Sequence, residues 1–184
     1  MTTVFIIHGA YGSPDENWIP WLKGELEKKG CNVITPKFPT PEGQDLGTWL
    51  GVMRDYKNEI NEDTIFVGHS LAPAFILSII EMLERPVRAA FFVAPFVSEL
   101  GKPEFDLVNK TFYRKFDWAE IKERCKKFYV FHSDNDPYVP LEKAEFIAKQ
   151  LGVEVILVKG AGHFNKDAGY TTFDLLLQKI RGEL

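Results

Sequence analysis

Six short runs of β-branched and aromatic residues constrain the fold of this chain more than any other feature. They recur at intervals of roughly thirty residues. Each run is apolar almost throughout, which is typical of strands buried on both faces of a parallel sheet. The predicted strands cover residues 4–7, 33–35, 64–67, 89–93, 128–131 and 153–158.

Two helical patterns lie in the middle of the chain. Over residues 46–60 the apolar side chains recur on one helical face, which predicts an amphipathic helix. The segment after residue 70 is apolar nearly all round, which predicts a deeply buried helix. We expect this second helix to stop near Arg85, because Pro86 disfavours helical backbone at the residue before it.

Helical patterns also lie near both ends of the chain. The first pattern starts with Trp18, and Gly30 is expected to close that helix. The last covers residues 173–180, where Thr171 and Asp174 have the spacing of a capping box. Strand and helix thus alternate throughout, which predicts a six-stranded, mostly parallel sheet in a three-layer α/β/α sandwich with right-handed crossovers. No repeat or linker interrupts residues 1–184, so we expect a single domain.

Composition restricts the class of partner. The formal net charge is −4, with 45% hydrophobic and 26% charged residues, which argues against nucleic acid or an anionic membrane surface as a partner. Cys31 and Cys125 form no Cys-x-x-Cys pair, so we expect neither a disulfide framework nor a metal site. The sequence shows no signal peptide and no membrane-spanning run, so the expected location is the cytoplasm. Nothing in the sequence indicates the oligomeric state.

The segment GHSLA places Ser70 between a predicted buried strand and a predicted buried helix. That setting is required of a nucleophile elbow, in which a serine sits exposed on a sharp strand-to-helix turn. Gly68 and Ala72 flank it at two residues, where larger side chains would collide with backbone, although Ala72 replaces the usual second glycine. The alternative is that Ser70 only caps the helix, since the pentapeptide alone is a weak signal.

A serine nucleophile needs a histidine base and a carboxylate that orients it. Both residue types follow later predicted strands in the expected order, Ser, Asp, His. Residues 132–140 offer Asp134 and Asp136, of which Asp136 has the spacing typical of hydrolases, while Asp134 is expected to cap the turn. His163 lies in a glycine loop after the last strand and is the candidate base, the alternative being a surface histidine.

The remaining histidines are assigned other roles. His69 adjoins Ser70 across a tight turn and is expected to point away from it as a structural residue. His132, at a strand end, is expected in the core or a turn. His8 opens the loop HGAYGSP, which is similar to loops that supply an oxyanion-hole amide. The second amide would come from Leu71, and the sequence leaves Ala10 and Tyr11 as alternatives for the first. A phosphate-binding loop is disfavoured because no Gly-Lys-Ser/Thr follows.

Taken together, these segments resemble the α/β-hydrolase superfamily. More narrowly, they resemble the small serine-hydrolase family that includes retinoblastoma-binding protein 9 and bacterial relatives. The resemblance covers nearly the whole chain and rests on the motifs HGAYGSP, GHSLA, DWAEIK, SDNDPYVP and GAGHF. It implies a minimal α/β-hydrolase fold, a triad of Ser70, Asp136 and His163, no cofactor, and hydrolysis of small esters or amides. A Leu-x-Cys-x-Glu motif for retinoblastoma protein is absent, so no such partner is expected.

The expected function is therefore cleavage of a small ester or amide through an acyl-enzyme. Residues 95–126 are longer and richer in aromatics than the other connections and are expected to form a short roof over the site. Phe96, directly after the fourth strand, is the candidate substrate contact there, whereas Trp118 and Phe128 are expected to fill core. Two alternatives are an interaction module on the same fold with little activity and a cofactorless lyase or dehalogenase. Dehalogenases generally place a carboxylate where this chain has Ser70.

Overall fold

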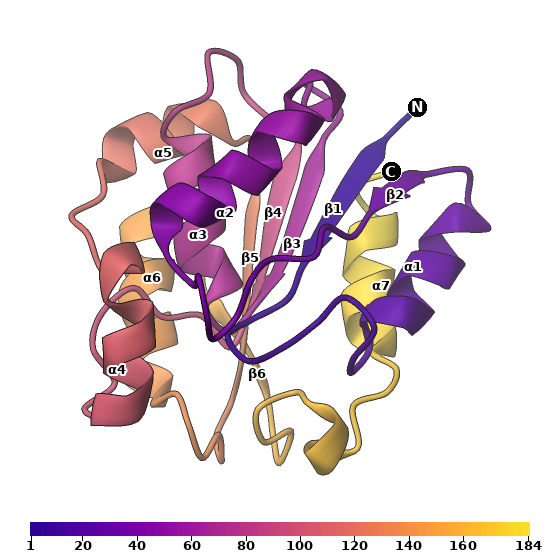
Figure 1. Cartoon of the computed structure of the whole chain (residues 1–184). Coiled ribbons are helices and arrows are strands. Elements are labelled where there is room, and N and C mark those ends of the chain that lie inside the picture. Colours follow the sequence, from indigo (N-terminus) through magenta and orange to yellow (C-terminus); the bar gives the residue numbers. More distant parts are fainter.

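The computed structural model describes all residues from Met1 to Leu184. Six strands form one sheet in the order β2-β1-β3-β4-β5-β6, and all neighbouring strands pair in parallel (Figure 1). The strands are β1 Thr3–Ile7, β2 Asn32–Ile34, β3 Ile65–His69, β4 Ala89–Val93, β5 Phe128–Ser133 and β6 Val155–Val158. Each overlaps one of the six apolar runs, with bounds that differ by up to two residues, so the predicted parallel α/β sheet is confirmed.

Helices cover both faces of the sheet and complete three layers (Figure 1). The α-helices are α1 Ile19–Glu27, α2 Leu46–Met53, α3 Ala72–Ile80, α4 Pro103–Asn109, α5 Trp118–Arg124, α6 Leu141–Leu151 and α7 Asp174–Arg181. The 3₁₀ helices are η1 Arg54–Glu59, η2 Lys110–Phe112 and η3 Lys166–Ala168. None of these helices has the length and apolar character needed to cross a membrane.

Alternate side chains of each strand belong to separate hydrophobic clusters. In β1, Val4 and Ile6 point into a cluster of 20 buried residues shared with α1 and α7. Phe5 and Ile7 point into a cluster of 29 buried residues shared with α2, α3, α5 and α6. This two-residue period places one core on each face of the sheet. Because both faces are covered, the strands are mostly apolar, and β1, β3 and β4 are buried at every position.

Helix α3 is shorter than the sequence predicts. All nine of its residues are buried, but it ends at Ile80 rather than near Arg85. The N–H groups of Met82 and Leu83 bond the carbonyls of Ile79 and Ile80, which tightens the last turn. Met82 is 66% exposed, so the chain has already left the core before the proline can end the helix.

Two other boundaries also differ from expectation. The pattern over residues 46–60 is an α-helix only to Met53 and continues as η1. The predicted capping box at Thr171 is wrong, because α7 has Phe173 as its N-cap and no side chain caps it. Phe173 is buried and stacks on Phe164, so aromatic packing decides where this helix begins. At the other end, Gly30 closes the turn after α1 with a positive φ of 80°, as predicted.

We expect Gly68→Ala to lower the free energy of unfolding by about 1–3 kcal/mol, the usual cost of overpacking a core. A Cβ at this position would lie 2.5 Å from Cδ1 of Ile76 and 3.1 Å from both Cβ of Ala72 and N of Pro73. Urea denaturation measures the effect. Gly24→Ala is the matched control, since no heavy atom lies within 4 Å of the new methyl, and alanine in a helix stabilises by about 0.5–1 kcal/mol. Equal urea midpoints for Gly68→Ala and wild type would contradict the tight β3–α3 contact.

Candidate active site

A cavity of about 740 Å³ opens where the strands end at their carboxyl edge. Its lining includes the residue after β3, Ser70, and residues of the loops after β1, β4, β5 and β6. Parallel sheets commonly carry their sites at this edge, because the loops after several strands converge there. The chemistry of the cavity therefore depends on which groups these loops present.

Ser70 occupies a strained turn between β3 and α3. Its φ is +61°, in the left-handed region that residues with a side chain rarely adopt. Its N–H donates to the carbonyl of Val93 at 2.8 Å, which anchors the turn to β4. Gly9 faces it so closely that a Cβ there would lie 2.9 Å from the Ser70 Cβ. The predicted strand–turn–helix geometry is present, and Ser70 lines the cavity rather than capping α3.

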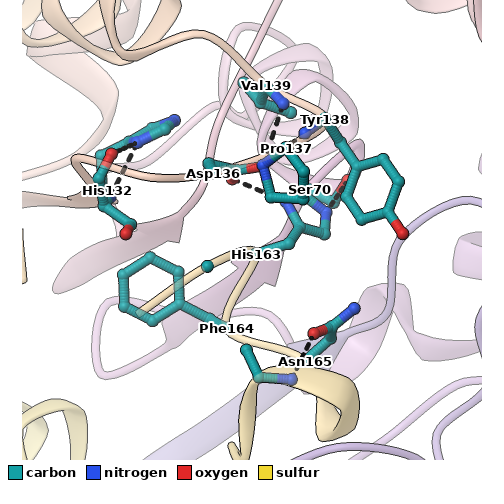
Figure 2. Close-up of polar contacts among 12 residues, drawn as sticks. Ser70, His132, Asp136, Pro137, Tyr138, Val139, His163, Phe164 and Asn165 are labelled. Atoms are coloured by element: carbon teal, nitrogen blue, oxygen red, sulfur yellow. Dashed lines mark hydrogen bonds and ion pairs between the residues drawn. The ribbon is translucent and has the colours of Figure 1, made fainter. Parts of the chain in front are cut away.

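Three side chains from different loops form one continuous hydrogen-bonded path (Figure 2). The Ser70 Oγ lies 3.0 Å from Nε2 of His163, and Nδ1 of His163 lies 2.7 Å from Oδ2 of Asp136. A carboxylate only accepts hydrogen bonds, so Nδ1 carries the proton and Nε2 is free to accept from the Ser70 hydroxyl. The structure thus brings together the three residues that the sequence singled out.

Asp136 is held in place on both of its carboxylate oxygens. Its side chain is 1% exposed, and Oδ1 accepts from the N–H groups of Tyr138 at 2.8 Å and Val139 at 3.0 Å. Burial raises the pKa of this carboxyl, but the bond and charge of His163 and the two N–H donors outweigh burial and leave the pKa below its usual value. Asp136 is therefore ionised at neutral pH.

Two neighbours of Asp136 join its loop to the loop of His163. Oδ1 of Asp134 accepts from the N–H of Gly160 at 2.7 Å, and Oδ1 of Asn135 accepts from the N–H of Gly162 at 2.8 Å. Asp134 therefore bridges two loops instead of capping its own turn, which corrects the expectation from sequence. Asn135 was not singled out at all, and only the structure reveals its role, because its partner lies 27 residues away.

His69 and His132 are buried, as expected for structural residues, but His69 does not point away from the site. Its Nε2 lies 2.7 Å from the carbonyl oxygen of His163, and the two rings are 4.8 Å apart. Burial, with a further contribution from the neighbouring His163, lowers the pKa of His69 to about 3, so it donates to this carbonyl as a neutral ring. His132 lies deeper, away from Ser70 in Figure 2, and its Nε2 has no partner.

His8 fixes the orientation of the first peptide of its loop. Its Nε2 accepts from the N–H of Phe38 at 3.0 Å, so Nδ1 carries the proton and donates to the carbonyl of Gly9 at 2.8 Å. The same carbonyl accepts from the N–H of Gly12 at 3.3 Å. In a planar trans peptide, C=O and N–H point in opposite directions. Holding the Gly9 carbonyl therefore directs the N–H of Ala10 the other way.

The three candidate amides of the site differ in their partners. The N–H of Tyr11 donates to Oγ1 of Thr40 at 2.7 Å. The N–H groups of Ala10 and Leu71 donate to no acceptor in the protein. The backbone N–H groups of Ala10 and Leu71 are thus free, and they lie on two loops that meet at Ser70. The N–H of Tyr11 is not free.

Aromatic and aliphatic side chains form part of the cavity wall. Those from the predicted roof are Phe96, Leu100 and Phe105, and the loop after β5 adds Tyr138 and Val139. The Tyr138 ring lies edge-on to His163 with 5.1 Å between centroids (Figure 2).

Other parts of the predicted roof do not reach the cavity. Trp118 packs against the core as expected, and so does Phe112. The loop after β1 adds Ala10, Tyr11 and two glycines to the cavity wall, and the other lining residues are polar or charged. No group of three His, Cys, Asp or Glu side chains lies together as metal ligands would.

Comparison with known proteins agrees with this architecture. YdeN of Bacillus subtilis (strain 168) is 30% identical over 175 residues, which cover 94% of this chain and 91% of that protein. Serine hydrolase RBBP9 of Rattus norvegicus is 26% identical over 168 residues, covering 91% and 86% of the two chains. The crystal structure of the B. subtilis ydeN gene product superposes with a TM-score of 0.93 at 28% identity, over 100% of this chain and 98% of that one.

More distant structures share the fold alone. Est1E of Butyrivibrio proteoclasticus superposes with a TM-score of 0.72 at 18% identity, over 98% of this chain and 86% of that one.

The family model described as serine hydrolase matches residues 4–181, which is nearly the entire chain. The matched range contains the Ser70 turn and the loops that carry Asp136 and His163. This chain belongs to the serine hydrolase family.

Proposed function

We propose that the protein cleaves a small ester or amide through an acyl-enzyme, with Ser70 as nucleophile, His163 as base and Asp136 as the orienting carboxylate. The observation that carries this proposal is the unbroken path from the Ser70 hydroxyl through both ring nitrogens of His163 to Asp136. Each group has the polarity that its role requires: a hydroxyl donor, a free Nε2 acceptor and an ionised carboxylate.

In the first half-reaction, Ser70 Oγ forms a bond to the substrate carbonyl carbon while its proton moves to Nε2 of His163. The carbonyl oxygen gains the electron pair of the broken π bond and becomes an oxyanion. Asp136 stabilises the imidazolium that forms, because its Oδ2 already accepts from Nδ1. His163 then returns the proton to the departing alcohol or amine, which leaves an acyl-Ser70 ester.

The second half-reaction repeats these steps with water. His163 takes a proton from water as its oxygen attacks the acyl carbon, and the proton then passes to Ser70 as the acid is released. Each step uses side chains, backbone amides and water alone. The donors proposed for the oxyanion are the N–H groups of Leu71 and Ala10, which have no other partner. Ala10 is favoured over Tyr11 because the Tyr11 N–H is already engaged by Thr40.

The cavity wall favours a compact acyl group. Phe96 lines the cavity but is only 1% exposed, and Phe105 and Tyr138 pack edge-on with 6.0 Å between ring centroids. The Phe105 and Tyr138 rings offer apolar area to a short or aromatic acyl chain. We propose that residues 95–109 form the roof of this pocket.

We expect Ser70→Ala to abolish both hydrolysis of p-nitrophenyl esters and labelling by a fluorophosphonate probe, because each reaction needs Oγ as nucleophile. Both should be measured for wild type and variant, with acyl chains from acetate to octanoate. Activity that is highest at short chains would support the compact pocket. A folded wild type that shows neither turnover nor labelling would contradict the proposal and favour an interaction module on this fold.

We expect Asp136→Asn to lower kcat by about 10⁴-fold, because an amide cannot stabilise the imidazolium and allows the wrong ring tautomer. Steady-state kinetics on the best ester measures the loss. Asp134→Asn is the matched control, since its remaining carbonyl oxygen can still accept from Gly160 and it does not touch His163. Similar losses in the two variants would show that Asp136 has no special role.

A further inference from the structure

A chain of polar groups begins at the backbone of Tyr11, passes through the partly buried Thr40 and the buried Gln44, and ends in the cavity wall at Asn109. The N–H of Tyr11 donates to Oγ1 of Thr40, and the Thr40 hydroxyl donates to Oε1 of Gln44. Neither Thr40 nor Gln44 lines the cavity. The function proposed above therefore gives these two side chains no role.

Gln44 determines the direction of the chain. It is only 7% exposed, and its Nε2 donates to Oδ1 of Asn109 at 2.7 Å and to the carbonyl of Val108 at 3.2 Å. Because both partners are acceptors, the Gln44 side chain must present its NH₂ group to them. Its Oε1 then faces Thr40. The Thr40 hydroxyl must then donate to Gln44, so its lone pair faces the N–H of Tyr11.

The far end of the chain lies in the cavity wall. Asn109 is the last residue of α4, is 1% exposed and lines the same cavity as Ser70. The bond between Tyr11 and Thr40 joins residues 29 positions apart, and the bond between Gln44 and Asn109 joins residues 65 positions apart. The loop after β1 and the proposed roof are therefore connected through two side chains that form no hydrogen bond with Ser70 or His163.

Tyr11 needs such a restraint. Its φ is +58°, in the left-handed region that is unfavourable for a residue with a Cβ. The residue is 48% exposed, and its ring packs edge-on against Phe105, which is itself only partly buried, so the core does not hold Tyr11. The Thr40 bond fixes the peptide that follows Ala10, and the Gly9 carbonyl fixes the peptide that precedes it. Both peptide planes around Ala10 are thus anchored.

We propose that Thr40 and Gln44 are positioning residues for the oxyanion hole: anchored on Asn109, they hold the Tyr11 backbone so that the Ala10 N–H faces the oxyanion. This inference rests on the hydrolase function proposed above. Hydrogen-bond donors stabilise a transition state only when they are already aimed at the developing charge. Losing the hydrogen bond between Tyr11 and Thr40 should therefore weaken stabilisation of the tetrahedral oxyanion more than it weakens substrate binding.

The first test compares Thr40→Val, which removes the acceptor but keeps the shape, with Thr40→Ser, which keeps the hydroxyl. We expect Thr40→Val to lower kcat for p-nitrophenyl esters by about 10- to 100-fold, the range in which small misplacements act, with KM nearly unchanged. Thr40→Ser should recover most of that loss. Thr111→Val is the matched control, because Thr111 also accepts from a backbone N–H, that of Leu46 at 3.0 Å, away from the oxyanion loop.

A trifluoromethyl ketone separates positioning from general damage. Ser70 Oγ adds to its carbonyl carbon, the hydroxyl proton moves to His163, and the ketone oxygen becomes an oxyanion that the proposed amides must bind. We expect Thr40→Val to lower the affinity for the trifluoromethyl ketone by about the same factor as it lowers kcat. The affinity for the matching methyl ketone should equal that of wild type. Melting temperatures of all variants show whether folding is affected.

The variant Gln44→Met tests whether the groups act as one chain. Since Thr40 and Gln44 serve the same amide, the double variant Thr40→Val/Gln44→Met should lose little more than either single variant. Losses that multiply would overturn the proposal.

Three further outcomes would count against the inference. It fails if Thr40→Val keeps wild-type kcat and inhibitor affinity, or loses no more than Thr111→Val. Loss of methyl ketone and trifluoromethyl ketone binding to the same extent would also overturn it. In each of these cases an active, labelled wild type leaves the proposed function standing. A wild type that neither turns over esters nor reacts with the fluorophosphonate would overturn both.

Discussion

The close packing of β3 on α3 is the constraint on which the rest of the site depends. Gly68 lets the strand run directly against Ala72, Pro73 and Ile76, leaving only a sharp turn between the two elements. That turn forces Ser70 into the left-handed region and exposes its hydroxyl to the cavity. Because α3 is wholly buried, the turn cannot relax by shifting the helix. The sheet core thus holds one strained residue at a fixed place.

Other strain in the chain gathers at the same edge of the sheet. Besides Ser70, the residues with a side chain and a positive φ include Tyr11, Ala94 and Phe164, which follow β1, β4 and β6. Strained backbone persists only where its surroundings over-determine it, and it clusters at functional sites. Here the surroundings are specific hydrogen bonds: Ser70 to Val93, Tyr11 to Thr40, and Phe164 to Ala161.

Polar side chains with specific partners add to that rigidity. Asn135, although exposed, ties the two loops that carry Asp136 and His163. The buried His8 orients the Gly9 peptide, and the buried His69 bonds the carbonyl of His163. Each such group is costly to bury alone and stabilising once it has a partner, so it favours a single arrangement. The proposed mechanism needs this, because hydrogen-bond donors and the base must be in place before the substrate arrives. His132, whose Nε2 has no partner, is the exception.

The amino-acid sequence by itself determined the six strands, their alternation with helices and the order of Ser70, Asp136 and His163 along the chain. These are local properties: hydrophobic period, turn residues and motif spacing depend on neighbours in sequence. Tertiary structure decided where α3 ends, that Phe173 rather than Thr171 begins α7, that His69 contacts His163, and that the Tyr11 amide is engaged while the Ala10 amide is free. Each of these depends on packing or on partners from distant segments, which no local pattern specifies.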